Sequence, residues 1–275
     1  MNGSKPFRHF SLKHRIIAWI SSHLFDHITY TARHGLIRGM KRKGGLGWLP
    51  ASVSGSVETR EHQFWQSLDL SGKTVYDVGA FHGLLTLFFA SRARQVICYE
   101  PNQSNRKRLE ENVALNHLSN VRVRPTGLGS RRETLRMAFN PLTPGGATVD
   151  QRATDHLLRH SSGVRVEDVP VTTLASDIAE NQLPAPDFIK IDIEGWEIEA
   201  LRGARDILQT SHSELFLEMH GETMDEKKRK VAQIVEYIVG LGYQSIVHIE
   251  TSTPITIANS DVAAQGHLHC RWNIG

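Results

Sequence analysis

Two groups of residues in this 275-residue chain have types and spacings that suit chemistry. In the first, within residues 74–101, Asp77 is followed by Gly79 and Gly83 and, 17 residues after the second glycine, by Glu100. The apolar runs around them predict a strand, a glycine turn, a helix and a second strand that ends on Glu100. In a parallel sheet this order makes a crevice at the helix N-terminus, where a nucleotide-like ligand binds. The glycines allow close backbone approach, and the carboxylate can accept from both ribose hydroxyls.

The glycine spacing distinguishes between two cofactors that use such a crevice. A dinucleotide fingerprint needs G-x-G-x-x-G, and this loop has only two glycines. Its pattern D-x-G-x-x-x-G, with the later acid, resembles motif one and the ribose acid of class I S-adenosylmethionine-dependent methyltransferases. The resemblance implies that Gly79 and Gly83 flank the methionine moiety and that Glu100 holds the ribose. A strand-turn-helix without a ligand is the alternative.

The same resemblance implies further cofactor contacts along the carboxyl edge of the sheet. They are Asp77, Ala80, Pro101, Asn102, Gly127 and Asp192. Glu58 is another candidate, because in many methyltransferases a group that precedes the first central strand reaches the cofactor. Its alternative is an exposed surface charge, which is the usual role of a single glutamate.

The second group is the polar pair in the run Phe188 to Ile193. Lys190 and Asp192 interrupt an otherwise apolar strand, and strand alternation places both side chains on the same side. One interpretation is a structural ion pair at the strand end. The other is that Asp192, at the carboxyl end of a strand beside the switch point, faces the transferred methyl group.

Methyl transfer to a hydroxyl needs an aligned nucleophile and removal of its proton. Asp192 is the candidate base, Lys190 orients the substrate or stabilises an oxyanion, and His220 is an alternative base. A free Asp has a pKa near 3.9 and is a weak base for an alcohol, which motivates a metal variant. In that variant Asp192 and Glu218, with His220 or Glu222 behind them, hold Mg²⁺. Alternatively, Glu218 satisfies backbone groups at the following helix N-terminus.

Three longer segments resemble the FkbM family of methyltransferases. They are YDVGAFHG at 76–83, DFIKIDIEGWEIEALRGA at 187–204 and FLEMHGE at 216–222, and the resemblance covers about residues 55–250. It implies an α/β, Rossmann-like class I fold, with a mostly parallel seven-stranded sheet and helices on both faces. It also implies O-methylation of a sugar or another small hydroxylated metabolite.

Apolar-polar patterns predict the remaining strands. Strands are expected near 121–125 and 164–171, and residues 131–138 alternate weakly. Two further strands, at 243–249 and 266–272, are expected to pair at the sheet edge. His267, His269 and Cys270 have the residue types of metal ligands, but their spacing favours a strand. We therefore expect no metal site there.

Composition and charge limit the class of protein. With 40% apolar residues the chain can bury a full core, and we expect one methyltransferase domain at 55–275. Only two cysteines are present, which favours a reducing cytoplasm. No apolar run approaches the roughly 20 residues of a membrane span, and the N-terminus does not favour a cleaved signal peptide.

The first 54 residues are expected to form a basic helical arm and loop. Residues 1–50 hold nine of the 32 Lys and Arg but only one of the 29 acids. Ile16, Ile20, Leu24 and Ile28 recur every four residues, which predicts an amphipathic helix that packs on the core. Peripheral membrane contact or homodimerisation by this helix are alternatives.

Two other classes of function remain open at this stage. The basic arm would suit an RNA or other nucleic-acid methyltransferase, although the sequence has no N-P-P-Y-like site and no RNA-binding module. A cofactor-binding protein without catalysis would need the glycine loop but not Lys190 and Asp192.

Overall fold

The computed structural model describes residues 27–44, 59–140, 147–149, 151–160 and 163–272. Most of the expected N-terminal helix and Glu58 lie outside these residues. None of the helices within them is long and apolar enough to cross a bilayer.

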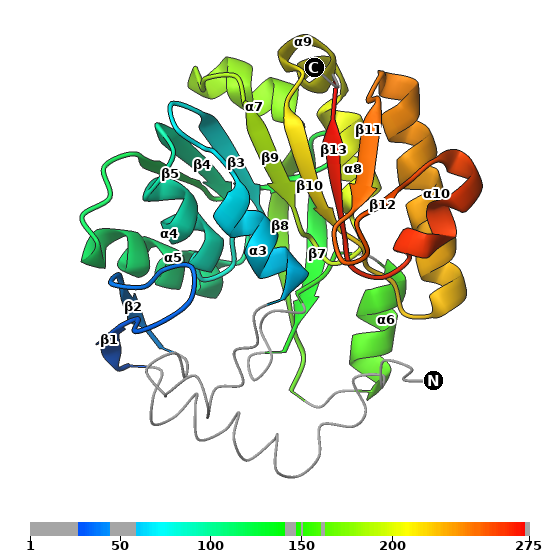
Figure 1. The fold of residues 1–275 in the computed structure, drawn as a ribbon. Coiled ribbons are helices and arrows are strands. Elements are labelled where there is room, and N and C mark those ends of the chain that lie inside the picture. Colours follow the sequence, from blue (N-terminus) through cyan, green and yellow to red (C-terminus); the bar gives the residue numbers. More distant parts are fainter. Residues whose placement is uncertain (1–26, 45–58, 141–146, 150, 161–162, 273–275) are drawn as a thin grey trace.

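The centre of the molecule is a mostly parallel sheet (Figure 1), which in the described residues has eight strands. In spatial order they are β12 (Thr253–Pro254), β11 (Ser245–His248), β13 (His267–Arg271), β10 (Glu214–Glu218), β9 (Phe188–Ile191), β3 (Thr74–Val78), β4 (Gln95–Tyr99) and β5 (Val121–Arg124). The strands from β10 to β5 are parallel, and β13 runs antiparallel to β10 and β11. Seven strands were expected, and the additional one is the two-residue β12. The expected antiparallel pair near the sheet edge is confirmed, as is the strand that contains His267 and Cys270.

Helices cover both faces of this sheet (Figure 1). One face carries α3 (Arg60–Ser67), α4 (Leu84–Ala90) and α5 (Gln103–Leu115), and the other carries α7 (Leu174–Asn181), α8 (Glu197–Gly203), α9 (Arg205–Ser211) and α10 (Met224–Leu241). Two helices begin at the capping residues that the sequence predicts. Asn102 caps α5 by accepting a hydrogen bond from the backbone N–H of Asn105, and Thr223 caps α10 in the same way. The three-layer α/β/α arrangement confirms the expected fold class.

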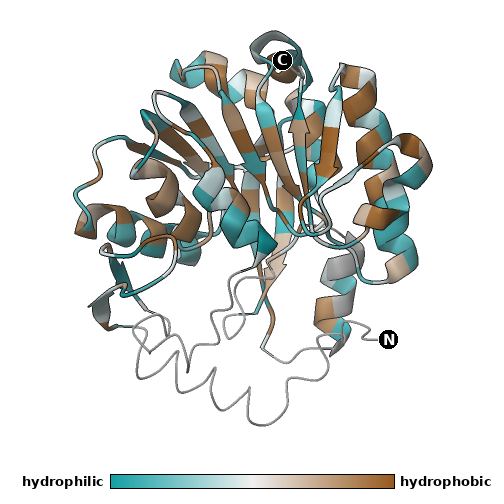
Figure 2. Ribbon diagram, viewed as in Figure 1, coloured by the Kyte–Doolittle hydropathy of each residue, from teal (hydrophilic) through white to brown (hydrophobic). Residues whose placement is uncertain are grey.

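Strand alternation divides the core into two parts. Val75 and Phe188 pack with α3 and α4, whereas their neighbours Tyr76 and Ile189 pack with the helices of the other face. Trp65 of α3 lies in the first part, 4.2 Å from the Phe216 ring centre. Figure 2 shows the result as apolar strands between helices that are polar on their outer sides.

A second sheet lies below the carboxyl edge of the first (Figure 1). Among the described residues it contains three strands, β6 (Gly127–Leu128), β8 (Arg165–Thr172) and β7 (Glu133–Phe139), and α6 (Gln151–His160) follows β7. The predicted strand at 164–171 is confirmed, and the weakly alternating residues 131–138 also lie mostly in a strand. They pair with each other over seven residue pairs instead of joining the main sheet, and this insertion between β5 and β9 forms one wall of the crevice.

The N-terminal region differs from the expectation where it is described. Residues 27–44 were expected to end a helix and continue as a loop, but they form a β-hairpin of β1 (Thr29–Thr31) and β2 (Lys41–Lys43). Ala32 and Ile37 of its turn are buried in the same apolar cluster as α4. The hairpin conformation pairs the backbone of the two strands and still buries Ala32 and Ile37.

Candidate active site

The glycine loop between β3 and α4 is fixed by both neighbouring strands. Gly79 has φ +80°, and a Cβ at this position would lie 1.8 Å from the backbone oxygen of Asp192, so only glycine fits. The N–H groups of Gly79 and Ala80 both donate to the Tyr99 carbonyl, at 3.1 and 3.0 Å. Gly83, at φ +84°, is the N-cap residue of α4. The backbone of the loop is therefore held in a fixed position relative to the carboxyl ends of the strands.

Glu100, the predicted ribose acid, is held at the end of β4 by two backbone donors. Its carboxylate accepts from the N–H of Phe81 at 2.8 Å and from the N–H of Asn102 at 3.0 Å. The residue is only 5% exposed, and burial raises its pKa to about 7 although both hydrogen bonds oppose the rise.

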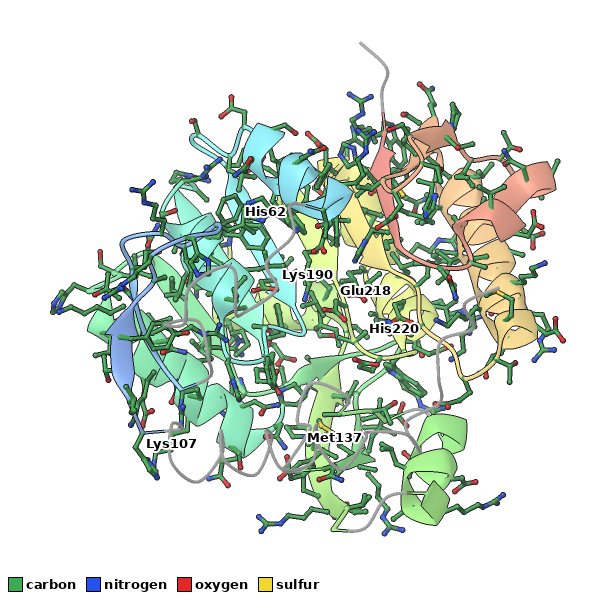
Figure 3. All side chains as sticks on the ribbon, turned by 60° about the horizontal axis from the view of Figure 1, so that its bottom comes forward. His62, Lys107, Met137, Lys190, Glu218 and His220 are labelled. Atoms are coloured by element: carbon green, nitrogen blue, oxygen red, sulfur yellow. The ribbon has the colours of Figure 1, made fainter. Side chains whose placement is uncertain are left out.

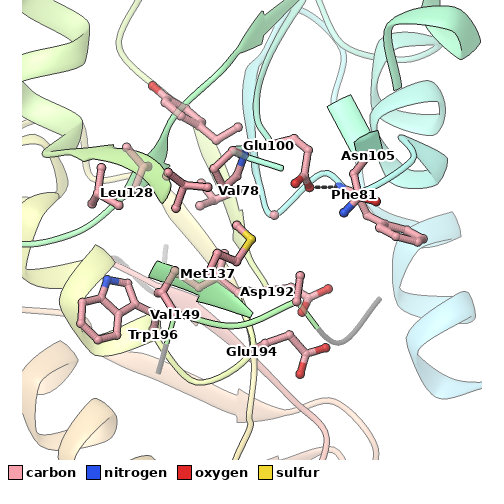
Figure 4. A pocket seen from close by; sticks show the side chains of 18 residues that line it. Val78, Phe81, Glu100, Asn105, Leu128, Met137, Val149, Asp192, Glu194 and Trp196 are labelled. Atoms are coloured by element: carbon pink, nitrogen blue, oxygen red, sulfur yellow. Dashed lines mark hydrogen bonds between the residues drawn. The ribbon is translucent and has the colours of Figure 1, made fainter. Parts of the chain in front are cut away.

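Between these groups lies a cavity of about 270 Å³ (Figure 4). Five of the predicted cofactor residues line it: Gly79, Glu100, Pro101, Gly127 and Asp192. Four other predicted cofactor residues do not line the cavity: Asp77, Ala80, Gly83 and Asn102. They form hydrogen bonds within the loop and the strand and helix ends next to the lining residues. The sequence thus predicted one half of the cavity.

The other half is an apolar wall that the sequence reasoning missed. Figure 4 shows Leu128, Met137, Val149 and Trp196 on this side. Most of the wall comes from the second sheet, which also contributes Val171. The sequence alone does not place Met137 and Val171 at the crevice, because their position depends on how β6, β8 and β7 pair.

Lys190 lies at the junction of the two predicted groups. It is 3% exposed, and its Nζ donates to the Gly79 carbonyl at 2.8 Å. The same atom is 3.4 Å from Asp77 Oδ1 and 3.2 Å from Asp192 Oδ2. Burial lowers the pKa of Lys190, but the two carboxylates outweigh it and hold the pKa above its ordinary value. This geometry confirms that Lys190 and Asp192 share one side of β9, and it supports an orienting role for the lysine.

Asp192 is a weaker base than its place at the strand end suggests. Burial opposes its ionisation, but Lys190 and then His220 keep its pKa below the ordinary value. An acid with a lowered pKa binds protons poorly near neutral pH. The ion pair with Lys190 therefore fixes the position of the Asp192 carboxylate and makes it a weaker base.

His220, after β10, lies near Glu218, as Figure 3 shows, and near three further carboxylates. Its Nδ1 is 2.9 Å from Glu197 Oε1, and its Nε2 lies 3.6 to 3.7 Å from oxygens of Asp192, Glu194 and Glu218. Burial lowers the pKa of the imidazole, but these carboxylates, Glu197 first, raise it to about 10. A protonated ring has no lone pair for a proton, so this state disfavours His220 as the alternative base.

The two predicted metal ligands are also brought together. Single ligand atoms of Asp192, Glu218 and His220 lie within 4.8 Å of one another, a spacing that can hold a metal ion. Glu222 does not belong to this group and is exposed. Lys190 and the protonated His220 already supply positive charge among these carboxylates.

Glu194 is a site residue that the sequence reasoning overlooked. It lines the cavity beside Asp192 (Figure 4), and its backbone has φ +53°, a strained conformation for a residue with a side chain. The Thr148 hydroxyl donates to its carbonyl at 2.9 Å. Burial raises the pKa of Glu194 to about 7, although His220 opposes the rise. A second acid two residues after Asp192 was the available signal.

The residues of this site lie within a segment that matches the model of a known protein family. The model of the methyltransferase FkbM domain matches residues 77–245 of the chain, which include the glycine loop, Glu100 and every residue of the His220 cluster. This match spans more than half of the chain.

Two curated fungal proteins are similar to the chain. Methyltransferase 1 of Beauveria bassiana is 24% identical over 147 residues, which are 48% of this chain and 58% of that protein. Methyltransferase sdnD of Sordaria araneosa is 28% identical over 158 residues, which are 48% of this chain and 61% of that protein. The chain therefore matches about three-fifths of the length of these relatives. Among solved structures, methyltransferase FkbM from Methylobacillus flagellatus KT is 20% identical, with a TM-score of 0.49 over 75% of this chain and 45% of that chain.

Proposed function

The chain belongs to the FkbM family of methyltransferases, and we propose that it transfers a methyl group from S-adenosylmethionine to a hydroxyl of a sugar or another small metabolite. The observation that carries this proposal is the single cavity shared by Glu100 and Asp192. One end of it offers a ribose acid and the glycine backbone, and the other offers carboxylates for the acceptor.

S-adenosylmethionine supplies an electrophilic methyl group on a sulfonium. Glu100 would accept hydrogen bonds from the ribose hydroxyls, and the backbone of Gly79 would border the methionine portion. Pro101 and Gly127 both line the cavity and would border the adenine. The remaining residues of the cavity then face the acceptor.

Residues of the acceptor side would align the hydroxyl and take its proton. Alignment about 3 Å from the methyl carbon provides much of the rate enhancement in such displacements. We assign proton acceptance to Glu194, because a base with a pKa near the working pH is the most effective. Asp192, held by Lys190, would accept a hydrogen bond from the same hydroxyl and orient it. The original assignment of Asp192 as the base stays the competing prediction.

Binding of Mg²⁺ by Asp192 and Glu218 is the second competing proposal. Mg²⁺ prefers oxygen ligands, and here the third donor would be an imidazole nitrogen that carries a proton. Because Lys190 and His220 already neutralise the carboxylates, we propose a reaction that does not require the ion. Chelation during turnover tests this choice.

The cofactor is tested first, by titration calorimetry of the purified protein with S-adenosylmethionine and, in parallel, with NAD. We expect micromolar binding of S-adenosylmethionine that Glu100→Ala weakens. Preference for NAD would overturn the proposal. Acceptors are then screened with a methyl-labelled cofactor over panels of sugars, hydroxylated metabolites and RNA.

Two alternatives give different results in these assays. Methylation of RNA but of no small molecule would support a nucleic-acid methyltransferase. A protein that binds the cofactor without catalysis would transfer no label to any acceptor. Normal cofactor binding together with lost turnover in Asp192→Asn would argue against that second alternative.

A further inference from the structure

The β1–β2 hairpin is a basic surface to which the proposed reaction assigns no role. Residues 27–44 contain five Lys and Arg, two His and no Asp or Glu. Arg33, Arg38 and Lys41 are exposed, and no carboxylate in the described part of the chain forms an ion pair with them. Lys43 differs, because it pairs with Glu111 of α5 at 3.0 Å. The hairpin therefore presents three exposed positive charges that no carboxylate of the described residues neutralises.

The hairpin is fastened to α5 by hydrogen bonds to its backbone. Asn116 accepts from the Lys41 N–H through Oδ1 and donates to the Lys41 carbonyl through Nδ2, both at 2.7 Å. Asn112 accepts from the Lys43 N–H at 2.8 Å. Because the backbone is held and Ile37 is buried, the basic side chains extend from a fixed support. A surface of this kind loses little backbone entropy on binding a partner.

The same contacts connect the hairpin to the cofactor loop. Asn112 uses its amide group to donate to the carbonyl of His82 at 2.8 Å, so two hydrogen bonds link Lys43 to the glycine loop. A partner on the hairpin would therefore contact a segment that is hydrogen-bonded to the glycine loop.

The composition of the hairpin and of the sequence that precedes it favours a lipid surface over a nucleic acid as the partner. The segment before it combines basic residues with Phe7, Phe10, Trp19 and Phe25. Aromatic and basic residues together are typical of segments that lie at a bilayer interface. Ile28, at the start of the hairpin, is 41% exposed. Anionic headgroups can accept the charges while the acyl boundary accepts the apolar groups.

We propose that the basic hairpin docks the protein on an anionic membrane surface. The electrostatic contacts with the headgroups are made by Arg33, Arg38 and Lys41. The hydrogen bonds of α5 to the hairpin and to the glycine loop hold the cavity in a fixed position relative to the membrane. Docking does not depend on the methyl transfer proposed above, so the two proposals fail independently.

The test is co-sedimentation of the full chain with lipid vesicles. One set contains phosphatidylcholine alone, and the other contains about one-third phosphatidylserine. We expect binding to the anionic vesicles only, and release of the protein at about 0.5 M salt, where charges are screened. Equal binding to both sets would overturn the proposal, because the interaction would then be purely apolar.

Matched variants test the surface itself. The triple variant R33Q/R38Q/K41Q removes three charges and should weaken vesicle binding by about 100-fold, since each charge near a membrane contributes roughly fivefold. The control R205Q/K228Q/R229Q removes three exposed charges from α9 and α10, on other sides of the molecule (Figure 1), and should bind within twofold of the parent. A midpoint of thermal unfolding that is unchanged in both variants would show that the fold is intact.

Two results of these assays would overturn the proposal. One is an equal loss in both triple variants, which would mean that the hairpin has no special role. The other is displacement of the protein from vesicles by a short single-stranded RNA at a lower concentration than the lipid, which would assign the surface to nucleic acid.

Discussion

Lys190 of β9 donates a hydrogen bond to the carbonyl of Gly79 in the β3–α4 loop, at 2.8 Å. The ammonium that pairs with Asp192 therefore also fixes the backbone that borders the cofactor portion of the cavity. Asp77 of β3 also forms an ion pair with Lys190, and it accepts a hydrogen bond from the Thr86 hydroxyl at 2.6 Å. One buried cation thus couples the cofactor side of the site to the acceptor side.

Replacement of this cation should be costly. Lys190→Met keeps the length of the side chain but leaves Asp77, whose side chain is 1% exposed, without a charge partner. Removing one member of a buried pair costs about 3–5 kcal/mol, and we expect a loss of unfolding free energy of that size. Urea denaturation measures it. Lys73→Met, which breaks the half-exposed pair with Glu214, should cost less than about 1 kcal/mol. Equal losses in the two variants would contradict the coupling role.

Glu100 should make both stability and cofactor binding depend on pH. Its pKa in the folded protein is about 7, against 4.5 ordinarily, so its neutral form stabilises the protein fully below pH 4.5. That contribution, about 3 kcal/mol, is lost as the pH rises through 7. Glu100→Gln should lack this dependence in unfolding titrations at several pH values.

Cofactor affinity should change in the opposite direction, because the ionised Glu100 is the form that accepts two ribose hydrogen bonds. S-adenosylmethionine binding should strengthen as the pH rises through 7, and the Glu100→Gln variant should bind about 10- to 100-fold more weakly with little pH dependence. A parent protein whose affinity is flat between pH 6 and 8 would speak against Glu100 as the ribose acid.

Glu194→Gln should reduce turnover without reducing cofactor affinity. Loss of a general base costs about 10²- to 10⁴-fold in kcat. Because Glu194 must be ionised to accept a proton, the parent rate should rise with pH and level off above about 7. The variant should lose this rise, whereas Glu110→Gln, an exposed change on α5, should keep it. If Asp192→Asn removes the pH dependence and Glu194→Gln does not, the base is Asp192.

The sequence allowed part of this site to be predicted, for a local reason. Alternation along β9 was sufficient to place Lys190 and Asp192 on one side, and their 3.2 Å contact confirms it. Capping by Asn102 was equally local. Met137 and Val171 could not be assigned to the cavity, because their approach depends on the register of β7 and β8 and on how that pair lies against the main sheet.

Chelation should leave turnover within about twofold of the untreated rate, because Lys190 and His220 supply the charge that a divalent ion would supply. The measurement is the rate of labelled methyl transfer after dialysis against EDTA, then after addition of Mg²⁺ or Mn²⁺. Loss of activity that Mg²⁺ restores, together with failure of restoration in Glu218→Gln, would establish the metal proposal instead.

Two helical glycines should respond to alanine in opposite ways, since only one of them is in contact with another segment. A Cβ on Gly203, in the last turn of α8, would lie 1.9 Å from the carbonyl oxygen of Gly129. Backbone cannot move aside as a flexible side chain can, so Gly203→Ala should destabilise the protein by about 1–3 kcal/mol.

A Cβ on Gly240 of α10 would meet nothing within 4 Å, and Gly240→Ala should stabilise the protein by about 0.5–1 kcal/mol, because alanine has the higher helix propensity. Thermal unfolding of both variants checks the pair. Gly129 also lies beside Trp196 at the wall of the cavity, since a Cβ on Gly129 would be 3.2 Å from the indole nitrogen. A shift of Gly129 should therefore disturb this wall, and we expect Gly203→Ala, but not Gly240→Ala, to weaken S-adenosylmethionine binding.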